Sequence, residues 1–140
     1  RKDHLSSHAG QIAFPGGRID GAQETATEAA LREAWEETGL GKEYVEPLGF
    51  LAGYLTVTSF AVVPVVALVK PGFTLQPHEG EVAEVFEVPL SFLMDSANHL
   101  KQHRDFENLT RYYYAMPYGD YHIWGATAGM IRNMYQMMYA

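Results

Sequence analysis

The sequence predicts an α/β fold in which a sheet of mixed strands is flanked by helices. Residues 24–38 are rich in Ala, Glu and Leu and stop at Gly39, as a helix does at a left-handed cap. Residues 45–57 and 60–69 are rich in β-branched and aromatic residues, which is typical of strands. Residues 126–139 predict a closing helix. Helices before and after strands indicate an α/β sandwich.

Shorter elements complete the first half of the prediction. Residues 10–14 predict a strand that ends at Pro15-Gly16-Gly17. The valine-dense strand at 60–69 is expected to be buried on both faces. Residues 82–88 alternate apolar and acidic side chains, which predicts a half-exposed strand, and residues 89–94 predict a short helix.

The second half is predicted to contain a loop, a hairpin and the last helix. Residues 101–109 are polar and irregular, which favours a loop. Residues 112–116 and 121–124 flank a turn at Gly119-Asp120, which favours a hairpin. In the closing helix one stripe is expected to be core, with a dimer contact as the alternative: Met130, Met134 and Met137.

Composition bounds the class of protein. The 140 residues, 47% hydrophobic and 19% charged, predict one globular domain over residues 1–140. The net charge of -7 argues against DNA or RNA as a partner, but a bound divalent cation would still allow a small anionic substrate. The absence of cysteine agrees with a reducing, cytoplasmic location. No apolar run approaches the roughly 18 residues of a membrane span, and no signal peptide is visible. Because the chain starts at Arg1 rather than Met, we expect missing upstream residues, including a first strand.

The helix at 24–38 carries an unusual concentration of acid. Residues three and four apart share a helix face, so Glu33 lies beside both Glu36 and Glu37. Such a cluster is either a solvated face or a place where a divalent cation offsets the repulsion, and Mg²⁺ prefers these hard oxygen ligands. Arg32 has Glu28 and Glu36 four residues away on either side, so it is expected to hold carboxylates in place.

Two adjacent glycines precede this helix. Gly16 and Gly17 let backbone groups approach a phosphate or a metal closely, and the Gly16 carbonyl would offer one more oxygen. A glycine pair alone is a weak signal. A glycine pair followed at fixed distance by Arg-Glu-x-x-Glu-Glu-x-Gly is a specific one.

These positions resemble the Nudix box, GX5EX7REUXEEXGU, through Gly17, Glu24, Arg32-Glu33, Glu36-Glu37 and Gly39-Leu40. The register holds from Glu24 onward, but six residues rather than five separate Gly17 from Glu24. The lead-in "HAGQIAFPGGRID" is similar to the HxGQxxFPGGxxD segment of the coenzyme A pyrophosphatase branch, which carries the extra residue. The segments "EVFEVPL" and "IWGATA" are also similar to that branch, so the resemblance covers most of the chain.

The resemblance implies a Nudix α/β/α sandwich with a mixed sheet and a hydrolase of nucleoside diphosphates linked to another moiety. In the coenzyme A branch the products are 3′,5′-ADP and 4′-phosphopantetheine. By motif position, Mg²⁺ or Mn²⁺ would be bound by Glu33, Glu36 and Glu37 with help from the Gly16 carbonyl. Arg32 and Glu24 would support the box, and a further catalytic carboxylate would come from a downstream loop, with Glu81 preferred over Glu79.

Several roles stay open at this stage. Glu33 and Glu81 are both candidates for the general base. Substrate contacts are expected from Gly17, Arg18, His8 and Gln11, although the last three also fit structural or surface roles. Five of the nine tyrosines fall in 112–121, where they would either stack on adenine or cover a hairpin. A basic cluster would either receive a phosphate or be ordinary surface charge: Lys101, His103, Arg104 and Arg111.

The function that these patterns favour is metal-dependent hydrolysis of the pyrophosphate bond of coenzyme A or its derivatives. One alternative is a Nudix pyrophosphatase acting on ADP-ribose or an NAD-like dinucleotide. Another is a Nudix module that binds a nucleotide without cutting it, against which the intact glutamates argue. The oligomeric state does not follow from the sequence.

Overall fold

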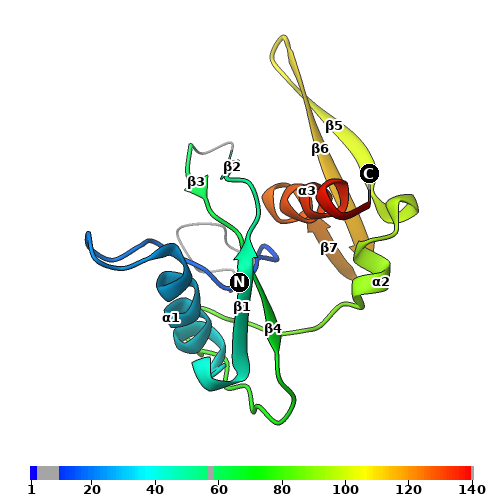
Figure 1. The fold of residues 1–140 in the computed structure, drawn as a ribbon. Helices are drawn as coiled ribbons and strands as arrows, with labels where there is room; N and C mark the ends of the chain where they lie inside the picture. Colours follow the sequence, from blue (N-terminus) through cyan, green and yellow to red (C-terminus); the bar gives the residue numbers. More distant parts are fainter. Residues whose placement is uncertain (3–9, 57–58, 140) are drawn as a thin grey trace. The chain divides into compact units, whose positions relative to one another are not determined.

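Residues 1–2, 10–56 and 59–139 are described in a computed structural model, in which the chain divides into two units (Figure 1). The first unit comprises Arg1–Gly53 and Val63–Phe86, and the second comprises Tyr54–Val62 and Glu87–Ala140. The prediction of one domain over the whole chain stays a prediction.

The first unit combines one long helix with a two-stranded sheet (Figure 1). Helix α1 spans Ala26–Thr38 and is followed by a short 3-10 helix, η1, at Lys42–Tyr44. Strand β1 (Val45–Phe50) pairs antiparallel with β4 (Val65–Val69), and a bulge shifts the register between Pro47 and Gly49. Gly39 ends the helix in the left-handed region, at φ 75°, as the sequence predicted.

Helix α1 begins with a capping box. The Thr25 hydroxyl accepts a hydrogen bond from the Glu28 N–H at 3.1 Å, and the Glu28 carboxylate accepts one from the Thr25 N–H at 3.0 Å. Two backbone donors that the helix leaves without intrahelical partners are thereby satisfied. Glu28 is therefore occupied at the cap and is not the Arg32 partner that its spacing allowed.

The second unit contains a hairpin, a three-stranded sheet and a long helix (Figure 1). Strands β2 (Tyr54–Leu55) and β3 (Ala61–Val62) form the small hairpin. The sheet has the order β5-β6-β7, with bounds Leu100–Phe106, Leu109–Tyr118 and Tyr121–Trp124. Helix α2 (Leu90–Leu93) and the 3-10 helix η2 (Ser96–Asn98) precede it, and α3 (Ala126–Tyr139) follows it.

The core of the second unit lies between α3 and the sheet. Met116 of β6 and Ala128 of α3 are fully buried, and Ile123 and Ile131 are nearly so. His99 is also buried: one ring nitrogen, Nε2, lies 2.6 Å from the Leu93 carbonyl, and Nδ1 lies 3.1 Å from the Arg132 guanidinium. An imidazole that donates to the carbonyl and accepts from arginine satisfies both nitrogens.

The predicted fold class is confirmed: helices and strands are mixed, and the strands form small antiparallel sheets. The helices at 89–94 and 126–139 and the hairpin around Gly119-Asp120 are also confirmed. Every ladder between described strands is antiparallel, so no parallel pairing of the predicted mixed sheet occurs in residues 10–56 and 59–139. Within those residues no helix is long and apolar enough to cross a membrane.

Several element predictions are wrong, each for a local reason. Residues 10–14 form no strand, and the Gln11 carbonyl instead accepts from the chain's first amino group at 2.7 Å. Pro64 interrupts 60–69, which divides into β3 and β4 and is not buried on both faces. Residues 82–88 form no strand: they follow a turn that ends with the Val82 N–H bonded to the His78 carbonyl at 2.9 Å, and no ladder between described strands includes them.

Two further predictions fail in the second unit. Residues 101–106 belong to β5 rather than to a loop, since that strand is stabilised by its ladder with β6 and not by a buried face. The expected methionine core of α3 is wrong for Met137, which is 65% exposed, while the buried residues of the helix are Thr127, Ala128, Gly129 and Ile131.

Removal of the Thr25 cap should destabilise the first unit. Thr25→Ala is expected to lower the free energy of unfolding by about 1 kcal/mol, because the Glu28 N–H loses its acceptor. Urea titration followed by circular dichroism measures the change. Thr74→Ala, at an exposed position, is the matched control and should stay within about 0.5 kcal/mol. Equal effects of the two substitutions would contradict the role of the cap.

The same cap predicts a pH dependence. The Thr25 N–H, and then the Thr25 hydroxyl, lower the pKa of Glu28 below its ordinary value of 4.5. A depressed carboxyl pKa adds stability above the unfolded-state pKa, and this stability is lost as the pH falls through the folded-state value. Between pH 6 and about pH 3, wild type should therefore lose more stability than Glu28→Gln. If the unfolding free energies of wild type and Glu28→Gln changed in parallel over that pH range, this role of Glu28 would be contradicted.

Candidate functional site

The two glycines before α1 contact the glutamates of that helix directly. The Gly16 N–H donates to Glu37 Oε1 at 2.8 Å. A Cβ atom added to Gly17 would overlap the carboxylate of Glu33. The turn therefore lies against two of the predicted metal ligands, and it presents to Glu37 the amide of Gly16 and not the carbonyl.

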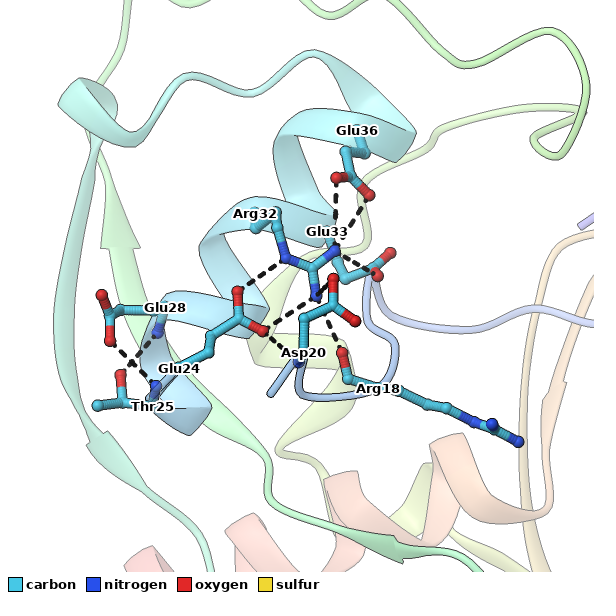
Figure 2. Close-up of polar contacts among 8 residues, drawn as sticks. All are labelled: Arg18, Asp20, Glu24, Thr25, Glu28, Arg32, Glu33 and Glu36. Carbon is cyan, nitrogen blue, oxygen red and sulfur yellow. Dashed lines mark hydrogen bonds and ion pairs between the residues drawn. The ribbon is translucent and has the colours of Figure 1, made fainter. Parts of the chain in front are cut away.

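Arg32 is the centre of the polar network on this helix (Figure 2). Its guanidinium binds Glu24 through two bonds, Nε to Oε2 at 2.8 Å and Nη2 to Oε1 at 3.1 Å. The remaining donor, Nη1, reaches Glu33 at 3.0 Å and Glu36 at 3.2 Å. A guanidinium presents its donors in a rigid planar fork, which suits one bidentate carboxylate and further single contacts.

The network also fixes the loop between the glycines and the helix. Arg32 Nη2 donates to the Arg18 carbonyl at 2.9 Å and lies 3.5 Å from the Asp20 carboxylate. The Asp20 N–H donates to Glu24 at 2.7 Å. In Figure 2 the side chain of Arg18 points away from the guanidinium that its carbonyl contacts. Residues 18–24 are thus tied to the helix at several points.

The charge states follow from these contacts. The hydrogen bonds from Arg32, and then that from the Asp20 N–H, lower the pKa of Glu24 below its usual range. Arg32 has its pKa raised, first by Glu24 and then by Glu33 and Glu36 against the effect of desolvation. Glu24 therefore carries its negative charge, and Arg32 its positive charge, throughout the physiological pH range.

Glu81 is brought to the same region by main-chain bonds. The Gln76 N–H donates to the Thr38 carbonyl at 2.7 Å, and the His78 N–H donates to the Glu37 carbonyl at 2.9 Å. A turn follows, with the Glu81 N–H bonded to the His78 carbonyl at 3.1 Å. The loop at 76–82 is therefore attached to the last turn of α1.

The pKa of Glu37 reflects the position of this loop. Its pKa is raised, chiefly by burial and also by repulsion from Glu33 and Glu81, while the Gly16 N–H and Arg1 act in the opposite direction. Repulsion from two carboxylates at a partly buried third one marks a region of concentrated negative potential around Glu37. The repulsion on Glu37 thus comes from Glu33 of the same helix and from Glu81 of a segment far along the sequence.

The donor set fits a divalent cation. Glu33, Glu37 and Glu81 are hard oxygen ligands, and a cation would relieve the repulsion that raises the Glu37 pKa. As arranged, no three His, Asp or Glu side chains within residues 10–56 and 59–139 surround a point where an ion would be held. The reason is that Glu33 and Glu36 are turned to Arg32 and Glu37 to the Gly16 amide.

Other predicted residues lie outside this cluster. Glu36 is 53% exposed and contacts Arg32, and Glu79 is exposed in the loop before Glu81. His8 lies outside the described residues. The Gln11 carbonyl accepts a hydrogen bond from the first amino group of the chain. Their roles stay predictions.

Some contributors were not predicted as part of the site. Asp20 and the Arg18 carbonyl position the loop through Arg32, and the amides of Gln76 and His78 position Glu81. Asp20 had a signal, because it belongs to the lead-in motif. The backbone contacts had none, since main-chain groups are the same at every position.

The structure holds a glycine turn against an acidic helix through an arginine. Comparison with known proteins identifies the family to which this arrangement belongs. The model of the NUDIX domain matches residues 1–110, which is more than half of the chain. The chain belongs to the Nudix hydrolase family, whose members generally use divalent metal ions.

Relatives of the chain include bacterial proteins named Uncharacterized Nudix hydrolase NudL. The chain is 39% identical to the one from Escherichia coli K12 over 138 residues, which cover 96% of this chain and 70% of the relative. Over the same spans it is 39% identical to the protein from Enterobacter sp. strain 638 and 40% identical to that from Citrobacter koseri.

The contact between Gly17 and Glu33 predicts a separation of activity from stability. Gly17→Ala would displace the Glu33 carboxylate, a flexible group, and Gly17 has no positive φ to strain. Misplacement of Glu33, a predicted metal ligand, by about 1 Å would cost up to about a hundredfold in rate. We therefore expect hydrolase activity about ten- to a hundredfold lower, with a free energy of unfolding within about 1 kcal/mol of wild type.

Gly16→Ala is the comparison for this variant. A Cβ there meets only the Phe14 carbonyl oxygen, at 4.0 Å, so the loss of activity should be smaller. Steady-state rates and urea titration of both variants provide the measurement. A Gly17→Ala enzyme with full activity would contradict the contact.

Proposed function

We propose that this chain hydrolyses the pyrophosphate bond of coenzyme A or its derivatives, releasing 3′,5′-ADP and 4′-phosphopantetheine. The observation that supports the hydrolytic part is the contact of Glu37 with the Gly16 N–H and of Glu33 with Gly17, two of the expected metal ligands beside the glycine turn. The choice of coenzyme A is supported by the lead-in "HAGQIAFPGGRID" and by its extra residue before Glu24.

The chemistry requires a cation because a pyrophosphate repels an incoming hydroxide. A bound Mg²⁺ or Mn²⁺ would supply neutralisation of the phosphate oxygens and activation of the attacking water. The residues that would hold it are Glu33, Glu36 and Glu37, with the Gly16 carbonyl assisting and Glu81 as a further carboxylate. Release of Glu33 and Glu36 from Arg32 would accompany binding, since both contact it here.

The remaining roles belong to protein groups alone. Arg32 and Glu24 would keep the glycine loop in place, as their paired contacts do in this structure. One carboxylate, Glu33 or Glu81, would accept the proton of the attacking water. Gly17, Arg18, His8 and Gln11 stay the proposed contacts to substrate.

Substrate identity is tested by product analysis. With Mg²⁺ or Mn²⁺ present, coenzyme A, ADP-ribose and NAD are each incubated with the chain, and the nucleotide products are separated by chromatography. Release of 3′,5′-ADP from coenzyme A at a rate far above the other two supports the proposal. Preferential cleavage of ADP-ribose or NAD would favour the alternative pyrophosphatase.

Glu37→Gln tests the hydrolytic site itself. The substitution removes one negative oxygen from the cluster and should lower hydrolysis by about a hundredfold or more, since a catalytic metal supplies several kcal/mol. Glu46→Gln, at an exposed position of β1, is the matched control and should leave the rate unchanged. Full activity of Glu37→Gln would overturn the assignment. Tight nucleotide binding by wild type with no turnover in either metal would favour a binding module.

The other expectations accompany this proposal. We propose a small-molecule nucleotide derivative as the partner. We propose no nucleic acid and no membrane as partners. Organisation as one catalytic domain and a cytoplasmic location stay predictions from the sequence.

A further inference from the structure

The second unit contains a cavity of about 260 Å³ that the hydrolytic residues do not line. Its lining has one basic residue, Lys101, no acidic one, and a majority of aromatic and small residues, among them Tyr54, Tyr112, Tyr114 and Gly129. Ligand cavities commonly begin at about 300 Å³. This one is therefore of a size to enclose part of a nucleotide rather than a whole dinucleotide.

Aromatic rings are concentrated at its wall. Tyr112 and Tyr114 are two residues apart on β6, so they share a face of the sheet. Lys101 of β5 lies directly opposite Tyr114 in the ladder. Tyr54 approaches α3 so closely that a Cβ on Gly129 would overlap its ring. The glycine is what allows a tyrosine to stand at this position against the helix.

Packing alone does not account for Tyr112. The Tyr112 ring contacts His103, with ring centroids 6.0 Å apart, and Lys101, yet the residue is still 66% exposed, so burial alone does not explain it. Exposed aromatic faces beside a cavity are the groups on which nucleobases stack.

The charges at the cavity favour an anion. Lys101 Nζ lies 5.2 Å from the centre of the Tyr112 ring, and no carboxylate of the described residues lies within 4 Å of it. Gly125 and Ala126 stand at the start of α3, whose 14 residues place a partial positive charge there.

We propose that this cavity binds a nucleotide, with the base against the tyrosine faces and a phosphate at Lys101. The Asn133 amide, which offers both a donor and an acceptor, would contact the base edge. The inference takes its site from the cavity and rests on the proposed function for the choice of 3′,5′-ADP. It extends the proposed function, since 3′,5′-ADP belongs to this class of ligand.

The test is calorimetric titration of the intact chain with 3′,5′-ADP in the presence of EDTA, so that no metal ion contributes to binding. Lys101→Met should raise the Kd about tenfold, a change of about 1.4 kcal/mol. Tyr112→Leu should raise it by a similar factor because the π face is lost. Tyr112→Phe keeps that face and should stay within about twofold. Lys70→Met removes a lysine from the first unit and is the matched control, with an unchanged Kd.

Two further ligands identify what is recognised. Adenosine should bind about tenfold more weakly than 3′,5′-ADP and should lose its sensitivity to Lys101→Met. The Kd for inorganic phosphate should not change in Tyr112→Leu. A Kd for 3′,5′-ADP that changes in neither Lys101→Met nor Tyr112→Leu would overturn the proposal, as would no binding at millimolar concentration.

The outcome is separable from that of the proposed function. If coenzyme A is not cleaved with metal but 3′,5′-ADP binds in a Lys101-dependent manner, the nucleotide cavity stands and the hydrolase proposal fails. If coenzyme A is cleaved while nucleotide binding ignores both substitutions, the cavity proposal fails and the hydrolase stands.

Discussion

The bidentate pairing of Arg32 with Glu24 is the constraint on which the site depends. Glu24 precedes the first residue of α1, whereas Arg32 lies at the middle of the helix, so the pair connects the incoming loop to the helix face. Without a guanidinium, Glu24, Glu33 and Glu36 would repel one another. With it, the same charges orient the loop and hold two side chains in defined directions. The concentration of glutamates at α1 is tolerated because the Arg32 guanidinium offsets the repulsion among them.

Backbone groups perform as much of the positioning as side chains do. The Gly16 amide contacts Glu37, the space left by Gly17 receives Glu33, and the His78 amide binds the carbonyl of Glu37. The acidic side chains therefore supply the negative charge, and the main-chain groups around them fix its position. This division explains why a short motif specifies a site whose parts lie more than sixty residues apart in the sequence.

The sequence predicted those elements whose signal is local. The left-handed cap at Gly39 and the limits of α3 followed from glycine chemistry and helical periodicity. Strand β5 was missed because its polar residues are stabilised by pairing with β6, which leaves no alternation in the sequence. In the candidate site, spacing allowed Glu28 to pair with Arg32. It bonds instead to the Thr25 amide, because a helix start has free donors that compete for a nearby carboxylate.

The attachment of the loop at 76–82 has a consequence for how this family member tolerates change. Its anchors are the amides of Gln76 and His78, which flank Pro77, a residue with no amide hydrogen to offer. Exchange of side chains along the segment leaves both anchors intact. Insertion or deletion of a single residue before Glu81 would instead rotate that carboxylate away from Glu37. Spacing, and not composition, is the property that evolution or a protein engineer must preserve here.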